Sequence, residues 1–234
     1  MRFLLTRENA SGPRRLIVGM EVAYMFMLHL GLTCRRKTLE LNRAVAAVWN
    51  FGIVSYALSQ SLDTSSLLTH YSPMPPSFMI AVWNESIFYA VHLIEEMLAR
   101  NTVYTLHHAG ALCSIATGLH YGYHQPMIIM FGVFTASSPF LYISKWAHHN
   151  QHDACAKVMF ALFSAVFFVS RIIACPIALK YTVVDAFYVP DINRVAYVTC
   201  NTILCSLYLL QWHWFKKIVG ILKLQVFRRA IKTD

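Results

Sequence analysis

The chain has 234 residues, of which 57% are hydrophobic and only 13% are charged. Because an average soluble domain is about 25% charged, this composition argues against a molecule that faces water on all sides. The net charge of +9 could suit nucleic acid, but the basic residues cluster at the ends of apolar runs, as in Arg35–Lys37 and Lys216–Lys217. That placement is typical of cations beside a membrane and argues against nucleic acid as a partner.

Apolar runs long enough to cross a membrane recur along the chain. A spanning helix needs roughly 20 apolar residues to cross about 30 Å of hydrocarbon, and lipid offers its backbone no other hydrogen-bond partner. Pro176 lies inside the sixth run and should kink that helix. The sequence predicts seven transmembrane helices, namely Leu16–Thr33, Ala44–Leu62, Ser77–Leu98, Val103–Tyr121, Met127–Trp146, Val158–Leu179 and Val195–Phe215.

The distribution of Lys and Arg predicts the orientation of these helices. With seven spans, the loops after the first, third and fifth spans and the C-terminal end carry more Lys and Arg than the opposite side. The positive-inside rule then places the C-terminus in the cytosol. The basic N-terminal tail favours six spans instead, with the first segment re-entrant or interfacial. We therefore expect an all-α, polytopic membrane bundle of six or seven helices around a central cavity, and seven is preferred.

The third predicted span contains several ionisable residues. Such side chains are costly in a membrane and are functional candidates by default. Glu85, His92 and Glu96 fall close to one helical face, which should look into the bundle. Glu95 and Glu96 also fit ordinary charges at the cytosolic end of a helix.

Two further features of the predicted spans could support chemistry. His107 and His108 open the fourth span, and a neutral imidazole suits either general-base or nucleophilic work. The same pair could equally form hydrogen bonds between packed helices. Arg171 lies in the sixth span and cannot be neutralised, so it needs an anionic partner or a wet cavity. Glu85, a lipid phosphate or a lipid carboxylate is the expected partner, and snorkelling to the interface is the alternative.

Other histidines invite a metal interpretation. His120 and His124 are four residues apart, and His148, His149 and His152 form a second group. Together with His107 and His108, the two groups faintly resemble the histidine boxes of membrane di-iron desaturases and hydroxylases. However, the predicted topology places them on opposite sides of the membrane. No metal site is therefore predicted.

Four short motifs follow one another along the chain. They are Leu106-His107-His108, then Ser137-Ser138-Pro139-Phe140-Leu141 before Lys145-Trp146, then Phe168-Val169-Ser170-Arg171 with Pro176, and finally Leu210-Gln211-Trp212-His213-Trp214-Phe215. This ordered set resembles the TLC domain, which ceramide synthases share with smaller lipid-homeostasis proteins. The resemblance covers roughly residues 40–225. It divides the chain into an N-terminal tail with a first helix (1–39), a TLC-like domain (40–225) and a basic cytosolic tail (226–234).

The resemblance implies a function for these residues. In ceramide synthases a histidine pair inside a helical barrel takes part in acyl transfer from acyl-CoA to the amine of a sphingoid base. By this resemblance His107 and His108 are catalytic, and Arg171 lines the same cavity. The ionisable residues of the third span add Glu85 and His92 to Arg171 as expected substrate-binding residues, with Glu85 as the expected ion partner of Arg171. Two departures set the chain apart from ceramide synthases. Residues 130–138 contain no acid, with Thr135 or Ala136 at the position that is usually acidic in the smaller proteins, and His92 stands where relatives commonly have Asp.

Three functional hypotheses follow. The first is a protein of lipid homeostasis in the endoplasmic reticulum membrane, which transfers an acyl group from acyl-CoA to a sphingoid base or other lipid without a cofactor. The second is a lipid-binding or trafficking protein with the same fold and no chemistry. The third is a metal-dependent lipid hydroxylase or desaturase. An open tunnel beside the histidine pair would favour the first over the second, and bound iron would favour the third.

Overall fold

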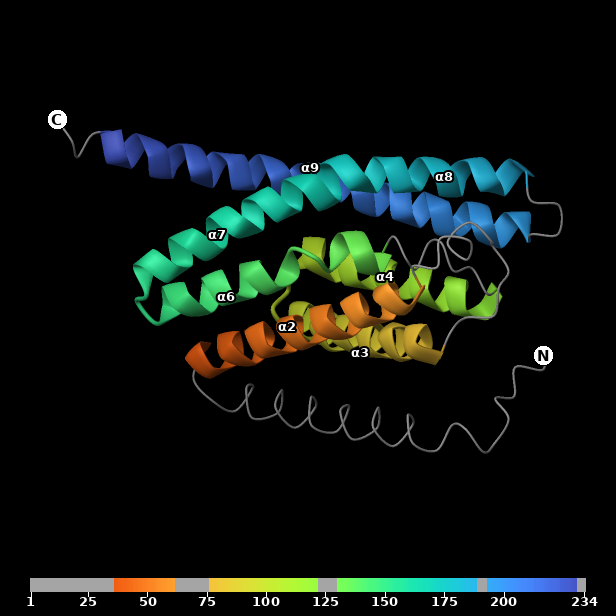
Figure 1. Ribbon diagram of the computed structural model, residues 1–234, viewed down its shortest axis with the longest axis horizontal. Coiled ribbons are helices and arrows are strands. Elements are labelled where there is room, and N and C mark those ends of the chain that lie inside the picture. Colours follow the sequence, from red (N-terminus) through yellow and green to blue (C-terminus); the bar gives the residue numbers. More distant parts are fainter. Residues whose placement is uncertain (1–35, 62–75, 122–129, 189–192, 231–234) are drawn as a thin grey trace.

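The computed structural model describes residues 36–61, 76–121, 130–188 and 193–230, in which every regular element is helical (Figure 1). The expected all-α class is thereby confirmed, whereas the expected first span, Leu16–Thr33, lies outside the described residues. The elements are α2 (Arg36–Ser61), α3 (Pro76–Leu98), α4 (Thr102–Tyr121), the π-helical η1 (Met130–Phe134), α6 (Ser138–His149), α7 (Asp153–Phe167), the π-helical η2 (Phe168–Ala174), α8 (Cys175–Tyr188) and α9 (Arg194–Ala230).

The helices are arranged as a closed ring. α2 packs against α3, α3 against α4, and α4 against α9. α9 then packs against α8 and η2, the chain α7–η2–α8 is continuous, and α7 packs against α6, which returns to α2. Figure 1 shows the turn between α6 and α7 at the same end of the molecule as the C-terminal part of α9. The ring encloses the space in which the candidate site lies.

The expected fifth span, Met127–Trp146, is not a single helix. η1 ends at Phe134, three residues form a turn, and α6 begins at Ser138 with Pro139 in its first turn. Proline lacks an amide hydrogen and its ring clashes with a preceding helical turn, so a helix can start at Pro139 but cannot run through it. The break places the side chains of the turn at the centre of the ring.

The expected sixth span, Val158–Leu179, is one continuous helical run with an irregularity where the sequence predicted a kink. The π-helical η2 occupies Phe168–Ala174 and passes into α8 one residue before Pro176. Pro176 cannot donate the usual backbone bond, and a wider π-helical turn accommodates the gap. Figure 1 shows the axis of α7 inclined to that of α8. Arg171 lies within η2 and therefore sits at the bend.

The last helix is longer than the expected span Val195–Phe215. α9 has 37 residues, so it is about 55 Å long at 1.5 Å per residue. The side-chain oxygen of Asn193 accepts a hydrogen bond from the backbone N–H of Ala196 at 3.1 Å and caps the start of α9. The helix thus exceeds the hydrocarbon thickness of about 30 Å.

Two helical segments of the described residues, Asp153–Lys180 and Arg194–Leu224, are long and apolar enough to cross a membrane. Their outer faces expose large apolar side chains, which a soluble surface would rarely gather in such numbers. These exposed residues include Val158, Leu162, Phe168, Val169, Ile173, Ile177, Val195, Val198, Leu209 and Trp212.

One end of the ring, which we call the packed end, contains a cluster of small and medium buried side chains. Ala81, Ala111, Cys175 and Cys200 are all fully buried, and they let the backbones of neighbouring helices approach closely. Gly110 belongs to the same seam, because a Cβ atom built on it would lie 3.2 Å from Cδ2 of Leu207. Larger residues complete this cluster: Val54, Val82, Tyr89, Ile115, Phe134, Leu179, Leu204 and Leu207.

Candidate functional site

The other end of the ring contains a cavity of about 1060 Å³. Its wall is built by α3, α4, η1, α6, α7, η2 and α9, so residues far apart in the sequence meet around it. Much of the wall is aromatic, contributed by Phe88, Tyr89, Tyr104, Phe134, Tyr142, Phe160, Phe163, Phe167 and Trp214. A mostly apolar cavity with a few convergent polar groups is the usual form of a small-molecule site.

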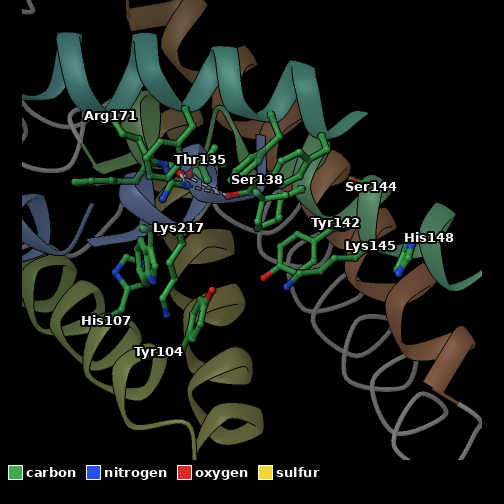
Figure 2. A pocket seen from close by; sticks show the side chains of 18 of the residues that line it. Tyr104, His107, Thr135, Ser138, Tyr142, Ser144, Lys145, His148, Arg171 and Lys217 are labelled. Atoms are coloured by element: carbon green, nitrogen blue, oxygen red, sulfur yellow. Dashed lines mark hydrogen bonds between the residues drawn. The ribbon is translucent and has the colours of Figure 1, made fainter. Parts of the chain in front are cut away.

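Arg171 lies at the inner end of the cavity. Figure 2 shows it beside Thr135 and Ser138, which come from the break between η1 and α6. The guanidinium donates to Oε1 of Gln211 at 2.9 Å, to Oγ of Ser138 at 3.4 Å and to the backbone carbonyl of Phe134. The bend in the α7–α8 run and the restart of α6 at Pro139 together create this polar pocket inside an apolar ring.

The histidine pair lies in the cavity wall. His107 and His108 are 7% and 6% exposed, and both contribute to the lining. The ring of His107 packs edge-on against Trp214 with centroids 4.8 Å apart, while His108 lies 5.6 Å from Tyr89. Within the described part of the chain, neither Nδ1 atom has a hydrogen-bond partner. Both imidazole rings therefore border the cavity.

His92, one of the predicted substrate-binding residues, lies behind the wall rather than in it. Its ring stacks on Tyr142 and lies 5.6 Å from that of His108, and it is not part of the lining. Its Nε2 is 3.9 Å from a carboxylate oxygen of Glu95, which in turn accepts two hydrogen bonds from Arg43 at 2.8 and 3.1 Å. His92 therefore belongs to the packing between α2, α3 and α6.

Glu85 also lies outside the cavity lining and has a different partner from the one expected. Its carboxylate accepts a hydrogen bond from the hydroxyl of Thr135 and interacts with the amide of Asn50. Asn84, which is half-buried, in turn donates to Asn50 and extends this network from α3 to α2. Among the described residues, Glu85 and Arg171 do not form an ion pair. Helical periodicity correctly predicts that Glu85 faces inward, but it cannot tell which neighbouring helix supplies the partner.

The mouth of the cavity is basic. Lys145 on α6, Lys157 on α7 and Lys217 on α9 converge there from three helices, beside the exposed His148 and Asp153. Figure 2 shows Tyr142, Lys145 and His148 following one face of α6 away from Arg171. The mouth therefore offers three ammonium groups where the interior becomes accessible.

Sequence reasoning missed most of this mouth and of the polar inner end. Ser138, Tyr142 and Lys145 are spaced four and three residues apart, a pattern that places them on one helical face. That spacing could have identified the face of α6 that lines the cavity. By contrast, Lys157 and Lys217 look like ordinary cations at helix ends, and only the tertiary fold brings them together.

The described members of the histidine groups considered for metal, which are His120, His148, His149 and His152, do not form a ligand set. In the described ranges, no three His, Cys, Asp or Glu side chains are grouped so that they could hold a metal ion. His124 lies outside those ranges. The rings of His148 and His149 are 6.1 Å apart at the end of α6.

Comparison with known proteins agrees with this architecture. The family model of the TLC domain matches residues 41–220. The chain is also 29% identical over 136 residues to Alternaria stem canker resistance protein 1 of Solanum lycopersicum, an alignment that covers 55% of this chain and 44% of that protein. The chain thus spans less than half the length of this curated relative.

The helical ring, its apolar outer faces and the match over most of the chain define the class of protein. It is a helical membrane protein, and the chain belongs to the TLC-domain family. The resemblance found in the ordered motifs is thereby confirmed.

Proposed function

We propose that this chain is a multi-pass membrane acyltransferase, which moves a fatty acyl group from acyl-CoA to the amine of a lipid. The observation that carries the proposal is the position of His107 and His108 in the wall of one large cavity. Its volume of about 1060 Å³ lies just above the range of about 300–1000 Å³ typical of ligand pockets. A cavity of this size, walled by aromatic rings, suits a long hydrocarbon chain.

The reaction needs a base close to the reacting carbonyl. The amine nitrogen forms a bond to the thioester carbon, the carbon–sulfur bond breaks, and CoA leaves as a thiol. The proton lost by the nitrogen is taken by an imidazole of the pair and returned to the departing sulfur. A neutral histidine performs both transfers without any cofactor. His107 and His108 are the imidazoles of the cavity wall that can do so beside its apolar section.

The basic mouth supports acyl-CoA as the donor. CoA carries several phosphate groups, and Lys145, Lys157 and Lys217 can bind them while the acyl chain enters the apolar interior. The predicted topology places this end in the cytosol, where acyl-CoA is soluble. Residence in the endoplasmic reticulum is part of the proposal and rests on the family resemblance.

A non-enzymatic lipid-binding or trafficking role is the second candidate. One observation favours it: within the described chain, no third group orients either histidine through Nδ1. Catalytic histidines are usually held in one tautomer by such a partner. A protein that kept the cavity and lost the chemistry would have this arrangement.

Acyl transfer by the purified chain in lipid nanodiscs separates the two candidates. Labelled acyl-CoA and a mixture of lipid amines are supplied, and the acylated products are separated and identified. We expect product from the wild type and a loss of at least about 100-fold in the His107→Ala/His108→Ala variant, because general-base catalysis contributes this much. His213→Ala is the matched control, since His213 lies on the exposed side of α9.

Folding of each variant is checked by its melting temperature and elution volume. A folded double variant that retains full transfer would eliminate the catalytic role of the pair. In cells that lack the protein, complementation with that variant should then also restore the lipid profile completely, as a binding or trafficking protein requires.

A further inference from the structure

Arg171 is a buried cation whose immediate partners are all neutral. The residue is only 8% exposed, and its hydrogen bonds go to an amide oxygen of Gln211, a backbone carbonyl and the hydroxyl of Ser138. The rings of Phe134 and Phe167 lie 5.8 and 4.9 Å from the guanidinium carbon. In the described structure its Nε has no hydrogen-bond partner. A charge removed from water in this way is costly unless an anion compensates it.

The acidic residues near the cavity are engaged elsewhere. Glu85 is bound by Thr135 and Asn50, and Glu95 is bound by Arg43. Asp153 lines the cavity but is exposed at its mouth. Glu85 interacts electrostatically with Arg171, but no carboxylate of the described residues forms an ion pair with the guanidinium. Arg171 itself lines the cavity that a ligand would fill.

The net positive charge of the cavity lining also favours a ligand that carries an anion. Its lining contains Arg171, Lys145, Lys157 and Lys217 but a single carboxylate, Asp153. A lipid amine without an anion enters such a cavity as an ammonium ion and is repelled. An amine that carries its own anion is attracted, because the potential inside a low-dielectric cleft is positive.

We propose that the acyl acceptor is an amine that also bears an oxyanion, a carboxylate or a phosphate, and that Arg171 binds this oxyanion at the inner end of the cavity. This inference rests on the acyl transfer proposed above and names the class of its second substrate. The hydroxyl of Ser138 accepts from the guanidinium and donates weakly to the carbonyl of Phe134 at 3.5 Å, so it can turn to donate to the oxyanion instead. Arg171 and His107 line the same cavity, so an acceptor whose anion is held by Arg171 can present its amine to the histidine pair.

Binding of simple amphiphiles tests this site without requiring any reaction. The probes are dodecyl phosphate, dodecanoate, dodecanol and dodecylamine, which share one chain length and differ in the head group. Each probe displaces radiolabelled dodecyl phosphate from the full chain in neutral-lipid nanodiscs, and empty nanodiscs correct for partition into lipid. We expect the anionic probes to bind at least about tenfold more tightly than dodecanol, since hydrogen bonds to charged groups are worth that much. The ratio of phosphate to carboxylate affinity identifies the oxyanion.

Variants of Arg171 and of the mouth lysines show which end of the cavity causes the preference for anionic probes over dodecanol. Arg171→Gln should abolish it, Arg171→Lys should keep part of it, and the mouth variant Lys145→Gln/Lys157→Gln/Lys217→Gln should keep most of it. The mouth variant alters no hydrogen bond of Arg171, so it decides the question even if Arg171→Gln fails to fold. Loss of the preference in a folded mouth variant would place the anion site at the mouth and overturn the proposal.

Transfer assays separate this inference from the proposed function. Binding of anionic probes should persist in His107→Ala/His108→Ala, which lacks the base. A protein that prefers anions at Arg171 but forms no amide would refute acyl transfer alone. Conversely, equal transfer rates to a sphingoid base without an anion and to its phosphorylated counterpart would refute the acceptor class while leaving acyl transfer intact.

Discussion

The two ends of the helical ring are built from different side chains. The packed end contains Ala81, Ala111, Cys175 and Cys200 at the helix contacts, so the helices approach closely there. The hollow end contains aromatic and basic residues, whose size and charge hold the helices apart around the cavity. Small residues therefore close the ring at one end, and large ones keep it open at the other. The basic mouth therefore belongs to the hollow end.

The boundary between the two ends is polar. Thr135 donates to Glu85 on the packed side, while Arg171 binds the carbonyl of Phe134 and the hydroxyl of Ser138 on the hollow side. All of these groups meet at the break before α6 and at the π-helical bend before Pro176. The two irregularities of the backbone are thus the points at which the packed end gives way to the cavity.

The largest loss of stability should follow from an enlarged side chain at the packed end. Ala111 is fully buried in the packed cluster, so Ala111→Phe has no space to occupy. Overpacking of this size should cost about 3 kcal/mol of unfolding free energy and lower the melting temperature of the protein. Leu141→Phe, in the cavity wall, should fold and only narrow the cavity. Melting temperatures of both variants check the prediction, and equal losses would contradict the division into two ends.

A smaller loss of stability is expected from substitution of Glu85, at the boundary between the two ends. Glu85→Ala removes the acceptor of Thr135 and a partner of Asn50, and each buried group left unpaired costs about 1–3 kcal/mol. Glu85→Gln keeps an oxygen in place for Thr135 and should cost less than about 1 kcal/mol. Thermal unfolding in detergent compares the two variants.

The pair of variants also distinguishes a structural from a ligand-binding role for Glu85. Because its side chain does not line the cavity, Glu85→Gln should leave the binding of the dodecyl probes unchanged. A folded Glu85→Gln protein with altered probe binding would show instead that the carboxylate acts on the ligand.

Much of the fold is predictable from the sequence because lipid forces long apolar runs into helices. The third and fourth spans, Ser77–Leu98 and Val103–Tyr121, differ from α3 and α4 by one residue at the start. The break before Pro139 was missed because apolar residues flank it on both sides, so hydropathy alone gives one run. Proline chemistry at Pro139 would have located it.

The candidate site was predictable only in part. His107, His108 and Arg171 stood out because ionisable groups in apolar runs are rare, and all three line the cavity. Glu85 and His92 met the same criterion but lie in the packing around the cavity. Helical periodicity predicts that a side chain faces inward, but not whether it meets other side chains or a cavity. The sizes of the side chains supplied by other helices decide between the two.

The smallest effect concerns the turn between α6 and α7 at the hollow end. Gln151 has a φ of 63°, in the left-handed region, and its N–H donates to the carbonyl of His148 to end α6. Glycine adopts this conformation without a clash at Cβ, so Gln151→Gly should stabilise the protein by about 1 kcal/mol. The melting temperature should rise by about 2–4 °C.

Gln151→Ala is the control because it keeps Cβ, and it should give no increase in melting temperature. An equal increase in both variants would assign the effect to the lost glutamine side chain rather than to the backbone. Neither change should alter binding of the dodecyl probes, since Gln151 does not line the cavity.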